Sequence, residues 1–297
     1  MKYRLMLLLT ALVWGCAFVA QRTGMDTIGP FAFNGLRFLL GALSLLPVIF
    51  LMKGKAESLQ DRPRWLTLPT ACLILGFFLF LGSTFQQIGL IYTTAGKAGF
   101  ITSLYIIAVP ILGFFLHHPL RQSHIIGCII AVIGLYLLAF HDTGRAMNLG
   151  DVLNLIGVIF WSFHILCIDR FVPYFSGVHL AIGQFAASSL FNFLAMPIAG
   201  ETLTAAAVMA SAVPILYCGI ISSAVGYTLQ IIGQTKVPPT EASLLCSFEM
   251  IFSALAGFFL LGEWMSLREI TGCLLMAVGI FAAQIPSRIV LQRKITE

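Results

Sequence analysis

The sequence has few charged residues. Of its 297 residues only 10% are Asp, Glu, Lys or Arg, whereas soluble globular domains carry roughly 25%. Long polar stretches are also lacking, so no part of the chain is suited to form a separate soluble domain. With 59% hydrophobic residues and a mean hydropathy of +0.96, the chain is expected to be a polytopic membrane protein, whose chemistry takes place inside the membrane.

Cysteine pairs and catalytic motifs are absent as well. The seven cysteines form no CxxC pair and all lie inside apolar runs, so we interpret them as packing residues and not as disulfides or metal ligands. A membrane-embedded enzyme needs clustered carboxylates or histidine–carboxylate pairs to hold a metal or a phosphate. No DxxxD, HxxxH or glycine-rich phosphate loop occurs here. The sequence therefore predicts no cofactor, no metal site and no enzymatic activity.

Long apolar runs make up most of the chain. A helix needs about 20 apolar residues to cross about 30 Å of hydrocarbon, and the sequence contains ten runs near this length. They lie at residues 5–21, 30–52, 66–90, 97–117, 123–140, 150–169, 178–199, 210–233, 239–261 and 268–286. We expect an all-α membrane protein with ten transmembrane helices.

The basic residues indicate how the chain is oriented. If the N-terminus lies in the cytoplasm, twelve lysines and arginines fall on the cytoplasmic side and only four on the other side. Loops that remain in the cytoplasm carry the excess of basic residues. Both termini are therefore expected in the cytoplasm. The net charge of +5 is explained by topology, and no nucleic-acid partner is expected.

The second half of the chain repeats the first. GFFL occurs at residues 113–116 and 257–260, an offset of 144. Trp14 and Trp161 correspond at an offset of 147, and Arg37 lies opposite Gln184. Because each unit has five spans, an odd number, the second unit enters the membrane from the opposite face. We expect two inverted repeats, residues 1–146 and 147–297, with the binding site near the midplane where they meet.

Paired glycines mark the fifth span of each repeat. GCIIAVIG at 127–134 matches GCLLMAVG at 272–279, and each run places two glycines seven residues apart. Seven residues is about two helical turns, so both glycines lie on one helix face and permit close packing of a neighbouring helix. These two helices are also candidates for a homodimer contact.

Glu249 is a carboxylate within an apolar run that extends from Pro238 to Glu263. It lies ten residues after Pro239, about 15 Å into its helix and near the bilayer centre. An ionised carboxylate in hydrocarbon is costly, so an intramembrane acid is functional by default. Desolvation favours its neutral form and a nearby cation favours its charged form. Glu249 is thus suited to bind a cationic group of a substrate or a coupling proton; the alternative is a neutral acid that only ties helices together.

Seven further residues are candidates for the same substrate or proton site. Arg37 lies roughly 10 Å inside the second span and is suited to hold a substrate carboxylate, with packing alone as an equal alternative. The others are polar or aromatic residues within the spans: Tyr227, Gln230, Trp14, Trp161, Tyr105 and His164. Packing or interhelical hydrogen bonding is the alternative for each of them. Tyr105 occupies the position of Glu249 in the first repeat.

Other polar residues have plainer interpretations. Two pairs of glutamines lie late in the third and eighth spans: Gln86 with Gln87, and Gln230 with Gln234. The two pairs are expected toward opposite faces of the membrane. Glu241 follows two prolines at an expected helix start, where a negative charge interacts favourably with the positive end of the helix dipole. Lys97 occupies the corresponding position in the first repeat. Three histidines lie close together in one expected cytoplasmic loop: His117, His118 and His124. We interpret them as solvated loop residues, with metal binding or pH sensing as the alternative.

Several stretches, taken in order, resemble one known family. They are WGCAFVAQ, PFAFNGLRFLLGAL, FITSLYIIAVPILGFFL, FWSFHILCIDRF, the run from TLQIIGQ to FFLLGE, and GCLLMAVGIFAA. Together they resemble the EamA-type transporters of the drug/metabolite transporter superfamily, over nearly the whole chain. The resemblance implies ten helices, cytoplasmic termini, a bacterial inner-membrane location and, usually, export of metabolites, amino acids or drugs.

The chain departs from the family pattern at one point. Many members end the fourth helix of both repeats with a glutamate. The second repeat keeps it at Glu263, whereas the first has His117-His118-Pro119. This difference argues against a mechanism that needs a symmetric pair of carboxylates at those ends.

The sequence favours a secondary transporter for small metabolites, amino acids or drug-like molecules, working by alternating access around a midplane site. Its expected partners are the small-molecule substrate, protons as a coupling ion and membrane lipid. Two alternatives remain open: a membrane-embedded enzyme acting on lipid-linked substrates, and a passive channel. Saturable exchange of labelled substrate distinguishes a carrier from a channel, and formation of a new compound indicates an enzyme.

Overall fold

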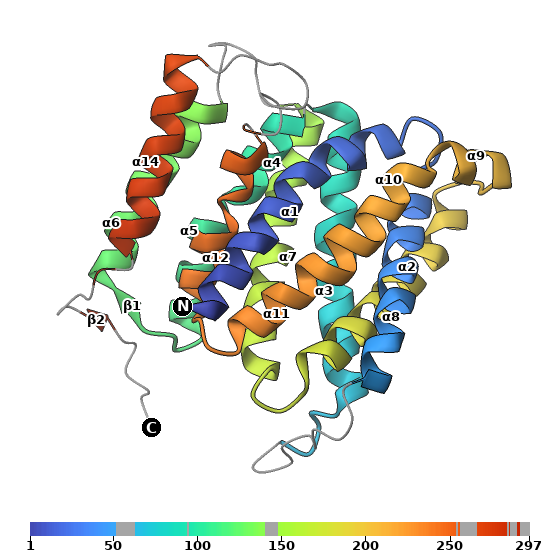
Figure 1. Ribbon diagram of the computed structural model, residues 1–297, viewed down its shortest axis with the longest axis horizontal. Helices are drawn as coiled ribbons and strands as arrows, with labels where there is room; N and C mark the ends of the chain where they lie inside the picture. Colours follow the sequence, from blue (N-terminus) through green and yellow to red (C-terminus); the bar gives the residue numbers. More distant parts are fainter. Residues whose placement is uncertain are drawn as a thin grey trace.

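The protein is almost entirely helical, as the computed structural model shows (Figure 1). The structure describes residues 1–51, 63–93, 95–139, 148–253, 255, 266–283, 285 and 290–291. The first half contains α1 (Lys2–Gly24), α2 (Pro30–Leu51), α3 (Leu68–Tyr92), α4 (Ala95–Ser103), α5 (Tyr105–Phe115), β1 (Leu120–Arg121) and α6 (Gln122–Ala139). The second half contains α7 (Leu149–Phe171), α8 (Gly177–Ile198), α9 (Ala205–Ala210), α10 (Ala212–Leu216), the π-helix η1 (Tyr217–Tyr227), α11 (Thr228–Gln234), α12 (Pro239–Cys246), α14 (Leu267–Ala283) and β2 (Val290–Leu291).

Seven helical segments in the described part of the chain are long and apolar enough to cross a membrane. They are Lys2–Gly24, Pro30–Ile49, Leu68–Tyr92, Ala98–Phe115, Leu149–Phe171, Gly177–Ile198 and Ala212–Gln234. Shorter apolar helices, Gln122–Leu137 and Ile270–Ala283, lie in two more of the expected ranges. The ninth range is described only in part. The chain is therefore an all-α membrane protein, and the count of ten transmembrane helices stays a prediction.

Two expected helices are interrupted near their centres, which the sequence analysis did not foresee. Residues 97–117 were expected to form one helix, but α4 ends and α5 begins on either side of Leu104. In the run that begins at Pro239, α12 ends at Cys246, and a turn at residues 247–248 precedes further helix. At both points a backbone N–H bonds to the carbonyl three residues earlier, Leu104 to Ile101 and Phe248 to Leu245. Such tightened turns leave the hydropathy of the run unchanged, so the apolar pattern does not reveal them.

The eighth expected span also departs from a single regular helix. It is built from α10, the eleven-residue π-helix η1 and α11. Wider helical turns of this kind are frequent at functional sites. A further departure from an all-helical fold is the short antiparallel pair in which Leu120 faces Leu291 and Arg121 faces Val290.

The helix contacts of the two halves mirror each other. α2 packs on α8, α6 on α14 and α5 on α12, and these are pairs of corresponding spans. The contact of α3 with α7 has its counterpart in the contact of η1 and α11 with α1. In the same way, the contact of α3 with α8 is matched by that of η1 with α2. Each of these helix contacts therefore has the counterpart that is expected when the two halves are related by two-fold symmetry.

A glycine-lined contact joins α6 and α14, which lie side by side at one edge of the bundle (Figure 1). A Cβ atom added to Gly127 would lie 2.5 Å from the carbonyl oxygen of Gly279. One added to Gly134 would lie 2.6 Å from the carbonyl oxygen of Gly272. The expectation that these glycines permit close helix packing is confirmed, and the two helices pair within one chain.

Replacing Gly134 with valine should destabilise the protein by forcing α6 and α14 apart. Over-packing of a close contact costs roughly 1–3 kcal/mol, and each kcal/mol lowers the melting temperature by about 2–4 °C in chains of somewhat smaller size. We expect a fall of several degrees in thermal unfolding of the detergent-solubilised protein. Leu274→Val, at an exposed position of α14, is the matched control and should leave the melting temperature nearly unchanged. Equal melting temperatures for Gly134→Val and the control would contradict the packing argument.

Candidate functional site

One cavity lies where α1, α2, α3, α7, η1 and the two interrupted helices converge. It contains seven of the eight residues proposed from the sequence and measures about 40 Å³. The lining residues are Trp14, Ala17, Phe18, Gln21, Arg37, Gln86, Thr102, Tyr105, Trp161, Ile165, Ser222, Tyr227, Gln230 and Glu249. A water molecule needs at least about 10–15 Å³, so in this conformation the cavity has room for a few waters.

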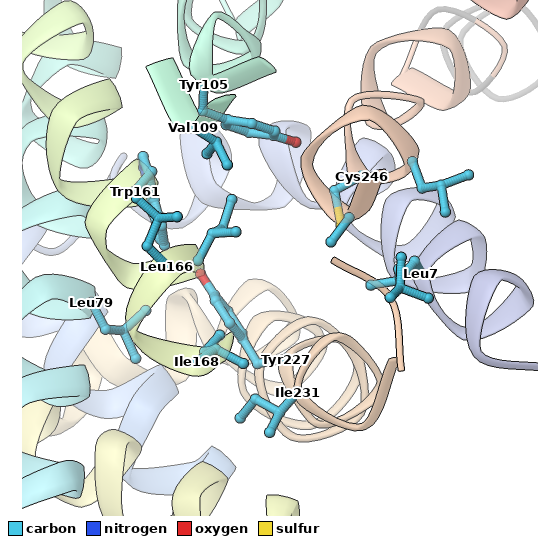
Figure 2. Packing of buried hydrophobic residues seen from close by; sticks show 14 of the residues in the cluster. Leu7, Leu79, Tyr105, Val109, Trp161, Leu166, Ile168, Tyr227, Ile231 and Cys246 are labelled. Carbon is cyan, nitrogen blue, oxygen red and sulfur yellow. The ribbon is translucent and has the colours of Figure 1, made fainter. Parts of the chain in front are cut away.

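Glu249 is the carboxylate of this cavity and is only 3% exposed. Its Oε1 accepts a hydrogen bond of 3.1 Å from the Tyr105 hydroxyl and one of 3.4 Å from Ser103 Oγ. Ser103 and Tyr105 flank the break between α4 and α5, and Glu249 follows the break after α12. Figure 2 shows the hydroxyl of Tyr105 directed toward the helix that carries Cys246. The two interruptions therefore bring the three polar groups together.

Arg37 brings a second charge to the cavity from α2 and is 2% exposed. Its guanidinium carbon lies 4.6 Å from the centre of the Phe38 ring and 5.9 Å from that of Phe33, a favourable position for a cation. Its Nε and Nη2 atoms have no hydrogen-bond partner among the described residues. Buried donors without partners carry a desolvation penalty, so this guanidinium is prepared to receive an anionic group.

Aromatic rings form the wall between these polar groups. The rings of Trp14 and Tyr227 lie 4.6 Å apart, and those of Trp161 and Tyr227 stack at 6.2 Å. Trp14 Nε1 donates to the Ser222 carbonyl at 3.2 Å, which fixes that indole. Figure 2 shows Trp161 on α7 and Tyr227 on η1 approaching each other across the interior. Flat apolar surface of this kind suits the hydrocarbon part of a solute.

Two glutamines contribute neutral polar groups. Gln86 Nε2 donates to Thr102 Oγ1 at 3.2 Å, while Gln230 Oε1 has no partner within the described part of the chain. Both line the same cavity, although they were expected toward opposite membrane faces. Gln87 and Gln234 instead donate to the backbone carbonyls of Gln21 and Ile165, where they join helices.

His164 lies behind the aromatic wall and does not line the cavity. Its Nε2 is 2.8 Å from Gln184 Oε1, and its ring centre is 6.0 Å from those of Trp161 and Tyr227. Both members of the His164–Gln184 pair are fully buried. The structure thus favours a hydrogen-bonded buried histidine that supports the rings.

Residues that correspond in the two halves meet at the cavity. Trp14 and Trp161 both line it, as do Phe18 and Ile165, at the same offset of 147 residues. Gln86 and Gln230 are 144 residues apart and line it together. Tyr105 and Glu249 are also 144 residues apart and share a hydrogen bond.

Several lining residues were not predicted from the sequence. The largest group is Ala17, Phe18 and Gln21, which share one face of α1 with the predicted Trp14. Their spacing of three, four and seven residues from Trp14 is that of a single helix face. Following this spacing from Trp14 would have identified them. Thr102 and Ser222 in the lining, and Ser103 beside Glu249, gave no such signal, because isolated hydroxyl residues are common in apolar helices.

The remaining polar residues have different surroundings. His124 was predicted to be a solvated loop residue, and this is wrong: it lies in α6 and is only 4% exposed. His117 is exposed, and His118 Nε2 lies 3.8 Å from Asp169 Oδ2. Among the described residues, no group of three or more His, Cys, Asp or Glu side chains is placed to hold a metal ion.

Glu241 lies in the first turn of α12, as expected for a favourable dipole position. It also receives a bond of 2.8 Å from Arg4 Nη2. The contact therefore joins α12 to α1. Glu263 and the side chain of Lys97 lie outside the part of the chain that the structure describes.

Comparisons with known proteins agree with this architecture. The EamA-like transporter family matches residues 1–140 and again residues 148–283. An uncharacterized transporter of Archaeoglobus fulgidus is 28% identical over 276 residues, covering 92% of this chain and 83% of that protein. The uncharacterized transporter YoaV of Bacillus subtilis is 21% identical over 289 residues, covering 94% and 96%. A solved crystal structure superposes with a TM-score of 0.75 at 19% identity, covering 95% of this chain and 96% of its own.

Proposed function

Because the chain belongs to the EamA-like transporter family, we propose that it is a secondary transporter that moves small zwitterionic or amphipathic molecules by alternating access. The family match and the apolar helices identify a multi-pass membrane protein of a transporter family. The resemblance to EamA-type transporters noted from the sequence supports a bacterial inner-membrane location and export as further parts of this proposal.

The proposed architecture is two inverted repeats of five helices, residues 1–146 and 147–297, with both termini in the cytoplasm. The mirrored helix contacts and the double family match support it. So does the convergence of corresponding residues, such as Trp14 and Trp161, on one cavity. Transporters built from inverted repeats bind their substrates at the repeat interface, between discontinuous helices. The breaks at Leu104 and at residues 247–248 fit that pattern.

One observation carries the substrate class: the cavity holds a buried guanidinium and a buried carboxyl group that are not paired with each other. Within the described residues, neither Arg37 nor Glu249 has an ion-pair partner within 4.0 Å, the limit for such a contact. Burying unpaired charges is costly, and a solute with an anionic and a cationic end would satisfy both. The aromatic wall would receive its apolar part. Glu249 would take a proton when the cationic end is absent.

The proposal is tested by counterflow in proteoliposomes loaded with unlabelled amino acids that have apolar side chains. External labelled amino acid should accumulate transiently, and its uptake should saturate, because a carrier returns loaded sites across the membrane. Uptake that rises linearly with concentration, without counterflow, would indicate a channel. Conversion of the label into a new compound would indicate an enzyme. Either result would overturn the proposal.

A further inference from the structure

A second, larger hollow lies away from the central cavity, between α5 and α6. Its volume is about 310 Å³, and its walls are almost entirely apolar. Pro110 and Cys128 are buried lining residues, and Cys128 Sγ donates to the Ile106 carbonyl at 3.3 Å. An apolar cavity of about 150 Å³ holds benzene, so this groove has room for a segment of an acyl chain.

The groove opens sideways, toward the hydrocarbon of the membrane. Three isoleucines on its rim, Ile111, Ile129 and Ile133, are at least half exposed, with Ile129 at 57%. They belong to helices that are apolar along their length. On a polytopic membrane protein, an exposed apolar patch of this kind is expected to contact lipid. The groove is therefore accessible from the bilayer without passage through the central cavity.

Among the described residues that line this apolar groove, His124 carries the polar ring. His124 is 4% exposed, and neither of its ring nitrogens has a hydrogen-bond partner among the described residues. A neutral imidazole has one donor and one acceptor, and leaving both unsatisfied costs free energy. An unpartnered ring at the end of a hydrocarbon-lined groove indicates a ligand with an apolar chain and a polar head.

The charges near this ring favour an anionic head. His124 lies in the first turn of α6, where free backbone N–H groups attract phosphate, and exposed Arg121 immediately precedes that helix. The nearby carboxylate is that of Glu241 on α12, which packs against α6. Glu241 acts on the His124 ring more strongly than Arg121 does, but its carboxylate is engaged by Arg4 through the 2.8 Å contact described above. Arg121 and the N-terminus of α6 are therefore the groups that would attract an anion at the head of the groove.

We propose that the groove between α5 and α6 binds an anionic phospholipid of the membrane, with one acyl chain along Pro110, Cys128 and Ile129 and its phosphate at His124 and Arg121. This site is separate from the transport cavity. It requires only that the helices lie in a membrane, so it stands or falls independently of the proposed transport activity.

Native mass spectrometry of the full chain tests the proposal. The detergent-purified protein is incubated with equal amounts of phosphatidylglycerol and phosphatidylcholine that carry identical acyl chains. We expect at least a fivefold preference for phosphatidylglycerol, reduced below twofold in His124→Ala. Ile129→Trp fills the groove and should lose the bound lipid. Ile126→Trp, an exposed position of α6 that does not line the groove, is the matched control and should retain it.

The opposite outcomes would overturn the proposal. Equal retention of the two lipids by the wild-type protein would exclude the anionic site, and unchanged lipid binding by Ile129→Trp would exclude the groove. If the wild-type protein is a dimer and Ile129→Trp is a monomer, the groove is occupied by a second copy of the protein and not by lipid. If the variants do not fold, the wild-type protein can be tested in nanodiscs. The nanodiscs contain phosphatidylglycerol with a photoreactive diazirine on its acyl chain, and the labelled residues are identified after irradiation. Labelling should concentrate on residues 105–115 and 122–133, and even labelling of all lipid-facing helices would refute the site.

Discussion

Replacing Glu249 with glutamine should abolish the response of transport to a pH gradient and lower the transport rate at least tenfold. Glutamine keeps a carbonyl oxygen that can accept the hydrogen bonds from Tyr105 and Ser103, so the packing around the break survives. It cannot release a proton or carry a negative charge. Loss of one partner from a buried charged interaction costs about 2 kcal/mol or more, which corresponds to more than a tenfold change. The measurement is uptake into proteoliposomes with and without an imposed pH gradient.

The matched control for this experiment is Glu241→Gln. Glu241 lies on α12, in the same expected transmembrane run as Glu249, but it contacts Arg4 and does not line the cavity. This variant should keep the response to pH. If Glu249→Gln transports at the wild-type rate with the wild-type response, Glu249 is a neutral acid that ties helices together, and its hydrogen bonds to Tyr105 and Ser103 are its whole role.

The sequence predicted the composition of the site better than its geometry. Glu249 and Arg37 were identifiable because a charge inside an apolar run is costly and is retained only with a use or a partner. Trp14 and Trp161 were identifiable through the repeat. The interruptions beside Leu104 and Phe248 were not, since serine, leucine and phenylalanine occur freely within continuous apolar helices. Yet these interruptions bring Ser103, Tyr105 and Glu249 into contact.

Two histidines show that the polarity of neighbouring residues in the sequence does not determine the environment of a side chain. His124 follows several polar residues and was assigned to a solvated loop, yet the packing of α6 against its neighbours buries it. His164 was proposed for the site and instead bonds to Gln184 behind the aromatic wall. In both cases the tertiary contacts, which leave no trace in a single sequence, decide the environment of the ring.

The cavity combines a repeated scaffold with chemistry that occurs once. Glu249 corresponds to Tyr105 in the first half, and Arg37 corresponds to Gln184 in the second. Each half therefore contributes one ionisable group at a position where the other half has a neutral one. A mechanism that rocks the halves against each other would move the carboxyl group and the guanidinium with different units. A solute that bridges them would then be bound tightly only when both units present their groups to the same space.

This arrangement predicts a loss of selectivity when Arg37 is replaced with methionine, which has a similar length and no charge. Binding of amino acids with apolar side chains should weaken roughly tenfold to a hundredfold, because hydrogen bonds to charged groups contribute about 1.5–3 kcal/mol. Binding of the corresponding amines, which lack the carboxylate, should change little. Thermal-shift titration of the purified protein with each matched pair measures both affinities. The melting temperature without ligand should stay the same or rise, since the variant removes buried donors that have no partner in the described structure.

Arg37→Lys separates the charge from its geometry. Lysine keeps the positive charge but lacks the planar fork that binds both oxygens of a carboxylate, so its affinity for the amino acids should fall between those of the wild-type protein and Arg37→Met. Equal weakening of amino acids and amines in Arg37→Met would mean that the guanidinium holds the cavity in shape through its contacts with Phe33 and Phe38. Unchanged affinity for both would remove Arg37 from the site. The zwitterionic substrate class would then lose its anionic half, and Glu249 alone would point to cationic solutes.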